Sequence, residues 1–476
     1  MKSYQLNQFL FLKSGHINII KLFALLILVQ GCSAHYPVNE PITAIDPGSG
    51  YHLDRKWGSE DISDSLIVLV AFSGGGTRAA AFSYGVLEAL RDAKINWEGK
   101  ERRVLDEVDS ISSVSGGSFT AAYFGLFGDR IFEDYEDKFL KVDVEGHLTS
   151  SFLNPFTWFT TGSPLFGRSD YAAEYYDKIL FEDKTFGDIL NRPGAPIIQI
   201  NATEVSTGTQ FTFVQNIFDL LCSDLSTFPV SRAVAASSAV PVLFSSITIN
   251  NRAGTCGYQM DPNAKRALDN PDPYSRPYHL VELYAKYLDS KTYPYLHLYD
   301  GGLTDNLGIR PAINRLAVAG GAWNMAKLRH LTDMKRLVFI VVNAQAESSA
   351  HYSKLANPVP IMDTILGATS IPLNEYTFES LVAAKHAMKE FREGIIAGRC
   401  ADKEYDSETS GDCADFKDYL IYVDLEQLPD KGQSERLKQL PTSFVLKPEE
   451  VDELRAAAKT LLLQSKEFNN FMEDMK

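Results

Sequence analysis

The stretch SLIVLVAF, residues 65–72, constrains the fold more than any other part of the chain. An unbroken apolar run with several β-branched residues is typical of a strand buried on both faces of a parallel sheet. A glycine turn and an Ala- and Leu-rich segment that favours a helix follow directly, at 73–92. Further strand-like runs alternate with helical stretches and lie at 195–205, 209–214, 295–300 and 336–344. This alternation predicts an α/β fold with a mostly parallel central sheet.

The C-terminal part of the chain, residues 346–476, reads as a mainly helical extension with one strand at 419–425. Residues 447–472 predict a helix, with Pro448 and two glutamates at its start. Its apolar side chains fall near one face, which we expect to be turned to the core. They are Val451, Leu454, Ala458, Leu461, Leu462 and Phe468.

The charge balance excludes some function classes. The 476 residues carry a formal net charge of −15, which argues against a nucleic-acid partner bound through its phosphates. It argues equally against attachment to anionic lipid through a basic surface. Any attachment to a membrane must therefore depend on something other than a basic surface.

The N-terminal segment has features of a membrane-attachment signal. Residues 1–31 contain three lysines, no acid and the short apolar run LFALLILV at 22–29. Eight helical residues rise about 12 Å, too little to cross about 30 Å of hydrocarbon, so the segment predicts a signal peptide. The sequence VQGC, ending at Cys32, resembles the bacterial lipobox, in which this cysteine is lipidated. We expect an exported lipoprotein anchored to a membrane through Cys32, and the resemblance to enteric lipoproteins implies that Ser33 favours the outer membrane.

Removal of residues 1–31 would lower the net charge from −15 to about −18, because three lysines leave with no acid. Residues 32–64 are rich in Pro, Gly and polar residues and read as a tether between the anchor and the folded body. The alternative is that the apolar segment is buried in the fold and that Cys32 is incidental.

Apart from the lipidated Cys32, four cysteines remain in the predicted mature chain, and an even number suits an oxidising compartment. Of the three connectivities we favour nearest neighbours, Cys222–Cys256 and Cys400–Cys413; free buried thiols are the alternative. No CxxC or HExxH motif occurs, so the cysteine spacings do not suggest a zinc site. We expect neither a metal nor a cofactor.

The glycine turn Gly74–Gly75–Gly76 after the first strand has two chemically different uses. One is a dinucleotide site, since Gly74, Gly76 and Ala79 fit the spacing G-x-G-x-x-G/A. The other is an oxyanion hole, because glycine has no side chain that would obstruct a ligand approaching its backbone amide. A dinucleotide site also needs an acidic residue at the end of the next strand. That strand ends in SSVSGGS, which favours the oxyanion hole.

The second strand ends at Ser115, within SVSGG at 113–117. This is a variant of G-x-S-x-G in which Ser113 takes the place of the first glycine. In that motif a serine stands on a sharp turn from strand to helix, and small neighbours are needed because backbones come close. Gly116 and Gly117 satisfy the requirement, and the helix that follows aims its amides at the serine. Ser115 is therefore a candidate nucleophile.

A nucleophilic serine needs a base. None of the nine histidines has a marked context, and His297 falls within a strand, where we expect it to pack beside a neighbouring strand. The better candidate is Asp300, which ends a strand in LYDGGLTDN and precedes Gly301 and Gly302. Desolvation would raise the pKa of this carboxyl and let it accept the serine proton. A turn-forming Asp-Gly is the alternative.

Five ordered motifs resemble those of the patatin-like phospholipases: GGGTR (74–78), SVSGG (113–117), NATEVSTGTQFTF (201–213), AVAASSAVPVLFSSI (233–247) and DGGLTDN (300–306). The resemblance covers residues 65–345. It implies a three-layer α/β/α fold and a dyad of Ser115 and Asp300 in place of a triad. It also implies an oxyanion hole at Gly75 and Gly76, with Gly74, and a supporting basic residue, Arg78. Two positions depart from the family pattern: Ser113 stands in place of the first glycine of the motif, and Ala79 stands where glycine is frequent. Both replacements are small residues.

The resemblance implies hydrolysis of phospholipids or other lipid esters, in lipid degradation or remodelling. The main alternative is a lipid-binding or scaffolding lipoprotein that keeps the fold without useful catalysis; a histidine-assisted peptidase is a third hypothesis. The aromatic stretch 151–167 suits an acyl channel, a membrane contact or a packed cluster. The insertion at 252–294, with a Tyr-rich helix at 278–289, suits a lid.

Overall fold

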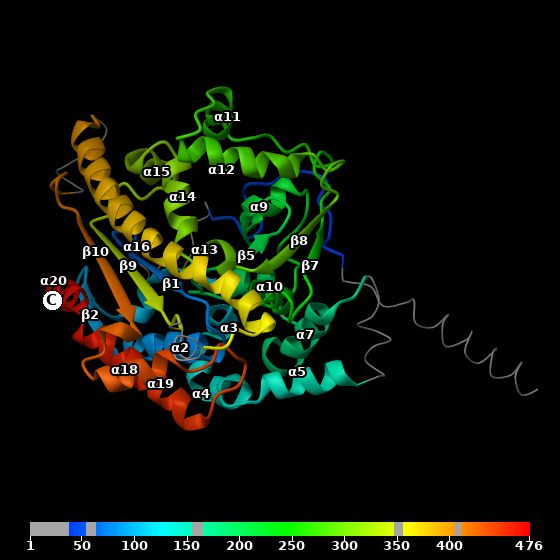
Figure 1. Ribbon diagram of the computed structural model, residues 1–476. Coiled ribbons are helices and arrows are strands. Elements are labelled where there is room, and N and C mark those ends of the chain that lie inside the picture. Colours follow the sequence, from blue (N-terminus) through cyan, green and yellow to red (C-terminus); the bar gives the residue numbers. More distant parts are fainter. Residues whose placement is uncertain (1–37, 54–62, 155–164, 347–355, 404, 406–410) are drawn as a thin grey trace, which may run out of the picture.

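The computed structural model describes residues 38–53, 63–154, 165–346, 356–403, 405 and 411–476. Its centre is an eight-stranded sheet, shown obliquely in Figure 1. The strands are β1 (Leu66–Phe72), β4 (Val108–Val114), β5 (Ile197–Glu204), β6 (Thr209–Thr212), β7 (Ile247–Asn250), β8 (Tyr295–Asp300), β9 (Arg336–Asn343) and β10 (Lys417–Asp424). A separate hairpin joins β2 (Lys94–Trp97) to β3 (Lys100–Arg103).

The sheet has the strand order β10-β9-β1-β4-β5-β8-β7, with β6 paired to β5 beside this path. The five strands from β10 to β5 run parallel. Both β8 and β6 are antiparallel to β5, and β7 is antiparallel to β8. The expected α/β fold with a mostly parallel central sheet is therefore confirmed.

Strand β1 is buried on both faces, as its unbroken apolar sequence predicts. Val68, Val70 and Phe72 belong to the larger of two apolar cores, whereas Ile67 and Ala71 belong to the smaller one on the opposite face. Burial of this kind contributes about 25 cal/mol per Å² of apolar surface, so both faces of β1 add to the stability of the fold.

Helices cover both faces of the sheet and complete three layers (Figure 1). On one side lie α2 (Gly76–Asp92), α3 (Gly116–Phe127) and α19 (Pro448–Gln464). On the other lie α14 (Arg310–Val318), α15 (Ala322–Leu328) and α16 (Ile361–Ala401). The other α-helices in the described residues are α4 (Ile131–Tyr135), α5 (Val144–Leu153), α7 (Arg168–Tyr176), α8 (Phe186–Asn191), α9 (Gln215–Leu220), α10 (Val230–Ser237), α11 (Pro262–Asp269), α12 (Arg276–Ala285), α13 (Gly302–Asp305), α18 (Lys431–Lys438) and α20 (Lys466–Asp474).

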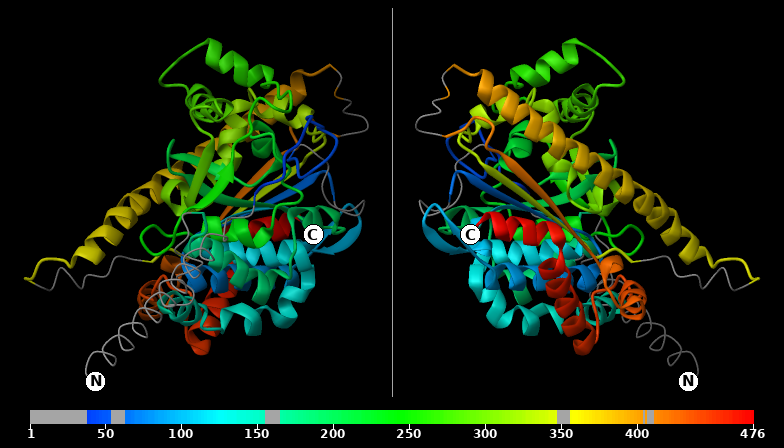
Figure 2. Two further views of the ribbon diagram at one scale, coloured as in Figure 1. Left: turned by 90° about the vertical axis from the view of Figure 1, so that its right-hand side faces the viewer. Right: turned by 90° about the vertical axis from the view of Figure 1, so that its left-hand side faces the viewer.

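The C-terminal segment is mainly helical, as expected, and it is built into the same body. Its strand β10 forms the edge of the central sheet beside β9, and α19 packs on α2. Figure 2 shows α16 crossing the body and extending beyond it at its N-terminal end. In the part of the chain that the structure describes, no helix combines the length and the hydrophobicity that crossing a bilayer requires.

One detail of this segment differs from the sequence prediction. The single helix expected over 447–472 is two helices, α19 and α20, which meet at Ser465. The Ser465 backbone is extended, and its hydroxyl caps α20 by accepting a hydrogen bond from the Phe468 amide. Serine at an N-cap satisfies an amide that has no partner within the helix, and this favours a break there. The predicted apolar face is buried across both helices.

The cysteines pair as nearest neighbours. The sulfur atoms of Cys222 and Cys256 lie at disulfide distance, and so do those of Cys400 and Cys413. The first pair ties the end of α9 to the insertion at 252–294, and the second closes the loop between α16 and β10. Cys32 and the predicted signal peptide lie outside the described residues.

Candidate active site

Ser115 stands at the break between β4 and α3. Its backbone has φ 50° and ψ −120°, a strained conformation for a residue with a side chain. The strain is held by a hydrogen bond from the Ser115 amide to the hydroxyl of Ser237, at 2.9 Å. This is the geometry of a nucleophile elbow, which turns the hydroxyl out of the strand and toward the start of the helix.

The small neighbours of Ser115 are required by close approaches of the backbone. A Cβ on Gly116 would lie 2.0 Å from the carbonyl oxygen of Gly76, and one on Gly117 would lie 2.7 Å from that of Ser73. Ser113, which replaces the usual first glycine, is fully buried and donates its hydroxyl to the Gln199 carbonyl at 3.3 Å. The departure at Ser113 is thus accommodated, because its polar atom has a partner.

Asp300 ends β8 and faces this elbow. Its Oδ1 accepts the Gly302 amide at 2.8 Å, and the Ser115 side chain also donates a hydrogen bond to the carboxylate. Burial raises the pKa of Asp300 from 3.8 to about 6, while the two hydrogen bonds act in the opposite direction. The structure therefore brings Ser115 and Asp300 together, with a carboxyl whose proton affinity is raised toward neutral pH.

The loop after Asp300 is fixed by the rest of the sheet. The Asp300 amide donates to the Ala239 carbonyl and the Gly301 amide to the Ser237 carbonyl, at 3.0 and 3.1 Å. A Cβ on Gly301 would lie 2.3 Å from the Asn201 carbonyl oxygen. Glycine is needed at position 301 because β5 passes so close to it.

The glycine turn lies next to the elbow. A Cβ on Gly74 would be 3.3 Å from the Cβ of Ser115, and a Cβ on Gly116 would be 2.7 Å from the Gly76 nitrogen. The Gly74 amide donates to the Asn306 carbonyl at 3.0 Å, so it is occupied and does not act as an oxyanion donor in this arrangement. The amides of Gly75 and Gly76 have no hydrogen-bond partner among the described residues. Two of the three expected donors thus remain.

Arg78 supports the turn from behind. Its buried guanidinium donates to the Ala344 carbonyl at 2.7 Å, to the Leu440 carbonyl, and to the Thr442 hydroxyl at 3.1 Å. Burial lowers its pKa to about 10. All its described partners belong to other segments of the protein framework. Arg78 is therefore placed to position the turn rather than to contact a substrate.

The segment that Arg78 holds also touches the turn directly. The Thr77 amide donates to the Ser443 carbonyl at 2.9 Å, and a Cβ on Gly76 would lie 2.3 Å from the same oxygen. We name residues 440–443 the C-terminal strap. The sequence offered no motif for it, because it contributes two backbone carbonyls and one threonine hydroxyl from far along the chain.

Ser237, at the end of α10, links the two halves of the site. Its hydroxyl accepts from the Ser115 amide, donates to the Asn201 carbonyl at 2.6 Å and lies 3.0 Å from the Ser118 hydroxyl. Its own carbonyl accepts the Gly301 amide. Ser237 was not singled out from the sequence, although it lies within the motif AVAASSAVPVLFSSI, whose paired serines were the available signal.

None of the histidines that the structure describes bonds to Ser115. His297 lies 3.2 Å from the Thr248 hydroxyl on the neighbouring strand, as expected for packing within the sheet. The aromatic stretch 151–167 is described only at its ends, where Phe152 packs against Tyr171 and Phe244.

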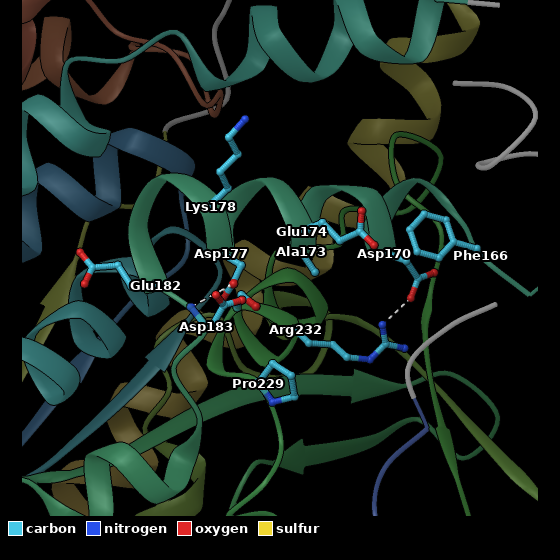
Figure 3. A pocket seen from close by; sticks show the side chains of 11 residues that line it. Phe166, Asp170, Ala173, Glu174, Asp177, Lys178, Glu182, Asp183, Pro229 and Arg232 are labelled. Carbon is cyan, nitrogen blue, oxygen red and sulfur yellow. Dashed lines mark hydrogen bonds and ion pairs between the residues drawn. The ribbon is translucent and has the colours of Figure 1, made fainter. Parts of the chain in front are cut away.

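A hollow of about 590 Å³ lies apart from Ser115 and Asp300 (Figure 3). Five of its eleven lining residues are acidic: Asp170, Glu174, Asp177, Glu182 and Asp183. Its buried Arg232 pairs with Asp170 at 2.5 Å, and neither Ser115 nor Asp300 belongs to its wall. Among the described residues, no cluster of His, Cys, Asp or Glu is arranged to hold a metal ion.

Comparisons with known proteins agree with the motifs. The chain matches the family described as patatin-like phospholipase over residues 70–313, just over half of its length. No curated protein matches it. The solved structure of human GIVD cytosolic phospholipase A2 is 15% identical, with a TM-score of 0.33; the match covers 60% of this chain and 46% of that one.

A chain from the complex of full-length SpcU with full-length ExoU of Pseudomonas aeruginosa is 13% identical, with a TM-score of 0.24. That match covers 87% of this chain and 91% of the other. Both TM-scores are too low to support a conclusion about function, whereas the family match spans the elbow, the glycine turn and Asp300. The chain belongs to the patatin-like phospholipase family.

Proposed function

We propose that the protein is a serine-dependent lipid acyl hydrolase in which Ser115 is the nucleophile and Asp300 the general base. One observation carries the proposal: the Ser115 side chain donates a hydrogen bond to the buried carboxylate of Asp300. Membership of the patatin-like phospholipase family supports lipid ester hydrolysis in general terms. Beyond this general activity, we propose that Ser115 and Asp300 catalyse a phospholipase, lysophospholipase or esterase reaction. We also propose that the reaction serves lipid degradation or remodelling.

The reaction begins with proton transfer from the Ser115 hydroxyl to Asp300 as the oxygen attacks the ester carbonyl. The tetrahedral intermediate collapses to an acyl-serine, and the Asp300 proton passes to the departing alcohol. A water molecule, deprotonated by Asp300, then hydrolyses the acyl-serine and releases a fatty acid. A pKa near 6 leaves the carboxyl ionised at neutral pH and more basic than an exposed aspartate.

The negative charge on the carbonyl oxygen needs donors that are already in place. The amides of Gly75 and Gly76 fit this role, because they lie at the turn beside Ser115 and have no described partner. Loss of one such donor costs about 3 kcal/mol of transition-state stabilisation in comparable sites.

The test is covalent labelling combined with product analysis. A fluorophosphonate probe should label the wild type and fail to label Ser115→Ala, and Asp300→Asn should be labelled slowly. Purified wild type incubated with phospholipid vesicles should release fatty acid, and Ser115→Ala should release none. Labelling that is absent from the wild type, or equal in Ser115→Ala, would favour the lipid-binding or scaffolding alternative. Activity that survives Asp300→Asn would favour a histidine base.

We further propose that lipidation at Cys32 holds this hydrolase at a membrane, with the outer membrane as its expected destination. The short apolar run and the VQGC sequence support this. Cell fractionation tests it: the wild type should sediment with membranes, and Cys32→Ser should lose the lipid mass and leave the membrane fraction. Equal sedimentation of both proteins would refute anchoring through Cys32.

A further inference from the structure

The side chain of Asn306 borders the proposed nucleophile. Its backbone directly follows α13, the short helix after Asp300. The point where a Cβ on Gly74 would lie is 2.5 Å from Oδ1 of Asn306 and 3.3 Å from the Cβ of Ser115. The Asn306 carboxamide and Ser115 therefore share the space beside Gly74, which only a glycine at position 74 leaves open.

A second glycine places the same carboxamide next to the proposed base. A Cβ on Gly302 would lie 3.0 Å from Oδ1 of Asp300 and 3.1 Å from Oδ1 of Asn306. The third neighbour of this point is a methyl group of Leu373 on α16, at 3.7 Å. The carboxamide thus lies between two glycines, with Ser115 beside the first and Asp300 beside the second.

The backbone that carries this carboxamide is held in place. The Asn306 carbonyl accepts the Gly74 amide at 3.0 Å. The Thr304 hydroxyl lies 3.0 Å from the hydroxyl of Thr203, which donates to the Asp300 carbonyl at 2.9 Å. These bonds fix the turn both to the glycine turn and to β5. A group that stabilises a transition state needs such a rigid support.

The carboxamide itself has no hydrogen bond to any residue that the structure describes. Asn306 is only half-buried, so a bound molecule can reach this group. A carboxamide offers two N–H donors, and rotation about its last torsion angle can turn them toward a ligand. The Asn306 carbonyl occupies the Gly74 amide, while the side chain of the same residue is placed to supply a donor in its stead.

We propose that the Asn306 side chain is the third oxyanion donor of this site and acts together with the amides of Gly75 and Gly76. The inference rests on the proposed function. As the Ser115 oxygen bonds to the ester carbonyl carbon, its proton passes to Asp300 and the carbonyl double bond becomes a single bond to a negatively charged oxygen. Asn306 donates an N–H to that oxygen. Side-chain amides are known to serve in oxyanion holes.

Kinetics of the full chain on a soluble ester test this contact. Asn306→Leu removes the donor at similar volume and should lower kcat about a hundredfold or more with little change in KM, since the bond strengthens as charge develops. Asn314→Leu on α14 is the matched control, because Asn314 lines a cavity to which neither Ser115 nor Asp300 contributes; its kcat should equal that of the wild type. An unchanged kcat in Asn306→Leu, or a change in KM alone, would overturn the proposal.

Two inhibitors separate an oxyanion donor from a merely structural role. Hexyl trifluoromethyl ketone should accept the Ser115 oxygen and form a hemiketal with a negatively charged oxygen, whereas hexyl methyl ketone should bind without reacting. Asn306→Leu should raise the inhibition constant of the trifluoromethyl ketone by about the factor by which kcat/KM falls. It should leave that of the methyl ketone unchanged. Equal losses for both ketones would indicate a distorted site and overturn the proposal.

Asn306→Asp provides a second reading if Asn306→Leu does not fold, as judged by its melting curve. A carboxylate has nearly the shape of the carboxamide but cannot donate and repels the developing charge, so kcat should fall at least as far. A wild type that neither hydrolyses the ester nor reacts with a fluorophosphonate would refute the proposed function and this inference with it. An active wild type matched by Asn306→Leu would refute this inference alone.

Discussion

Replacing Asp300 with asparagine should stabilise the folded chain more at pH 7.5 than at pH 5, while it removes the activity. The reason is the buried carboxyl, whose pKa rises from 3.8 to about 6 on folding. A carboxyl with a raised pKa binds protons more tightly in the folded state. Its contribution to stability is fully present below pH 3.8 and is lost as the pH rises through 6. Asparagine carries no charge at either pH.

The magnitude follows from proton linkage. With these two pKa values, the wild type gains about 1.4 kcal/mol from this group at pH 5 relative to pH 7.5. The stabilisation of Asp300→Asn over the wild type should therefore be about 1.4 kcal/mol larger at pH 7.5 than at pH 5. Both proteins share the other titrating groups. The pH dependence that these groups cause therefore largely cancels when the stability of Asp300→Asn is compared with that of the wild type at each pH.

Urea unfolding of both proteins at the two pH values, followed by tryptophan fluorescence, measures the difference. In parallel, kcat/KM of the wild type on a soluble ester should fall to about one tenth of its plateau at pH 5, since the base is then mostly protonated. A stability difference that does not change with pH, or a rate that stays flat down to pH 5, would show that this carboxyl is not the desolvated base described above.

Three further changes test the framework of the site. Ser237→Ala should lower kcat about tenfold with little change in KM, because the Ser115 amide loses its partner; Ser238→Ala is the matched control, and equal losses in both would remove the special role of Ser237. Gly116→Ala should abolish fluorophosphonate labelling in a protein that still folds, since its Cβ would meet the Gly76 carbonyl at 2.0 Å; normal labelling would refute the required close approach. Removing the Cys222–Cys256 pair by a double change to serine should cost about 3–4 kcal/mol in urea unfolding, and an unchanged midpoint would mean that the bond does not constrain the chain.

Local sequence patterns predicted the parts of the fold that depend on neighbouring residues. The apolar run of β1 indicated burial on both faces, and the break at Ser115 indicated a strand-to-helix turn, because strand periodicity and turn chemistry are short-range signals. Asp300 was a candidate base because it ends a strand and precedes two glycines, and the family resemblance supported its pairing with Ser115, since no spacing rule connects positions so far apart.

The parts that were missed depend on contacts between distant segments. Ser237 bonds to both the elbow and the Asp300 loop, yet within its own helix it reads as an ordinary small residue. The occupied amide of Gly74 depends on the Asn306 carbonyl, and a backbone carbonyl leaves no mark in a sequence. The capping of α20 by Ser465 could have been predicted from local sequence. It was missed because the apolar face continues across Ser465 and indicated a single helix.

The C-terminal strap has a consequence for the timing of activity. Arg78 and Leu440 are 362 positions apart, so a ribosome releases the glycine turn long before the residues that hold it in place. During that interval the nascent chain has Ser115 but lacks the carbonyls that fix the oxyanion donors. We expect hydrolysis to begin only after the strap has emerged, and stalled nascent chains ending before and after residues 440–443, compared by fluorophosphonate labelling, would reveal this delay.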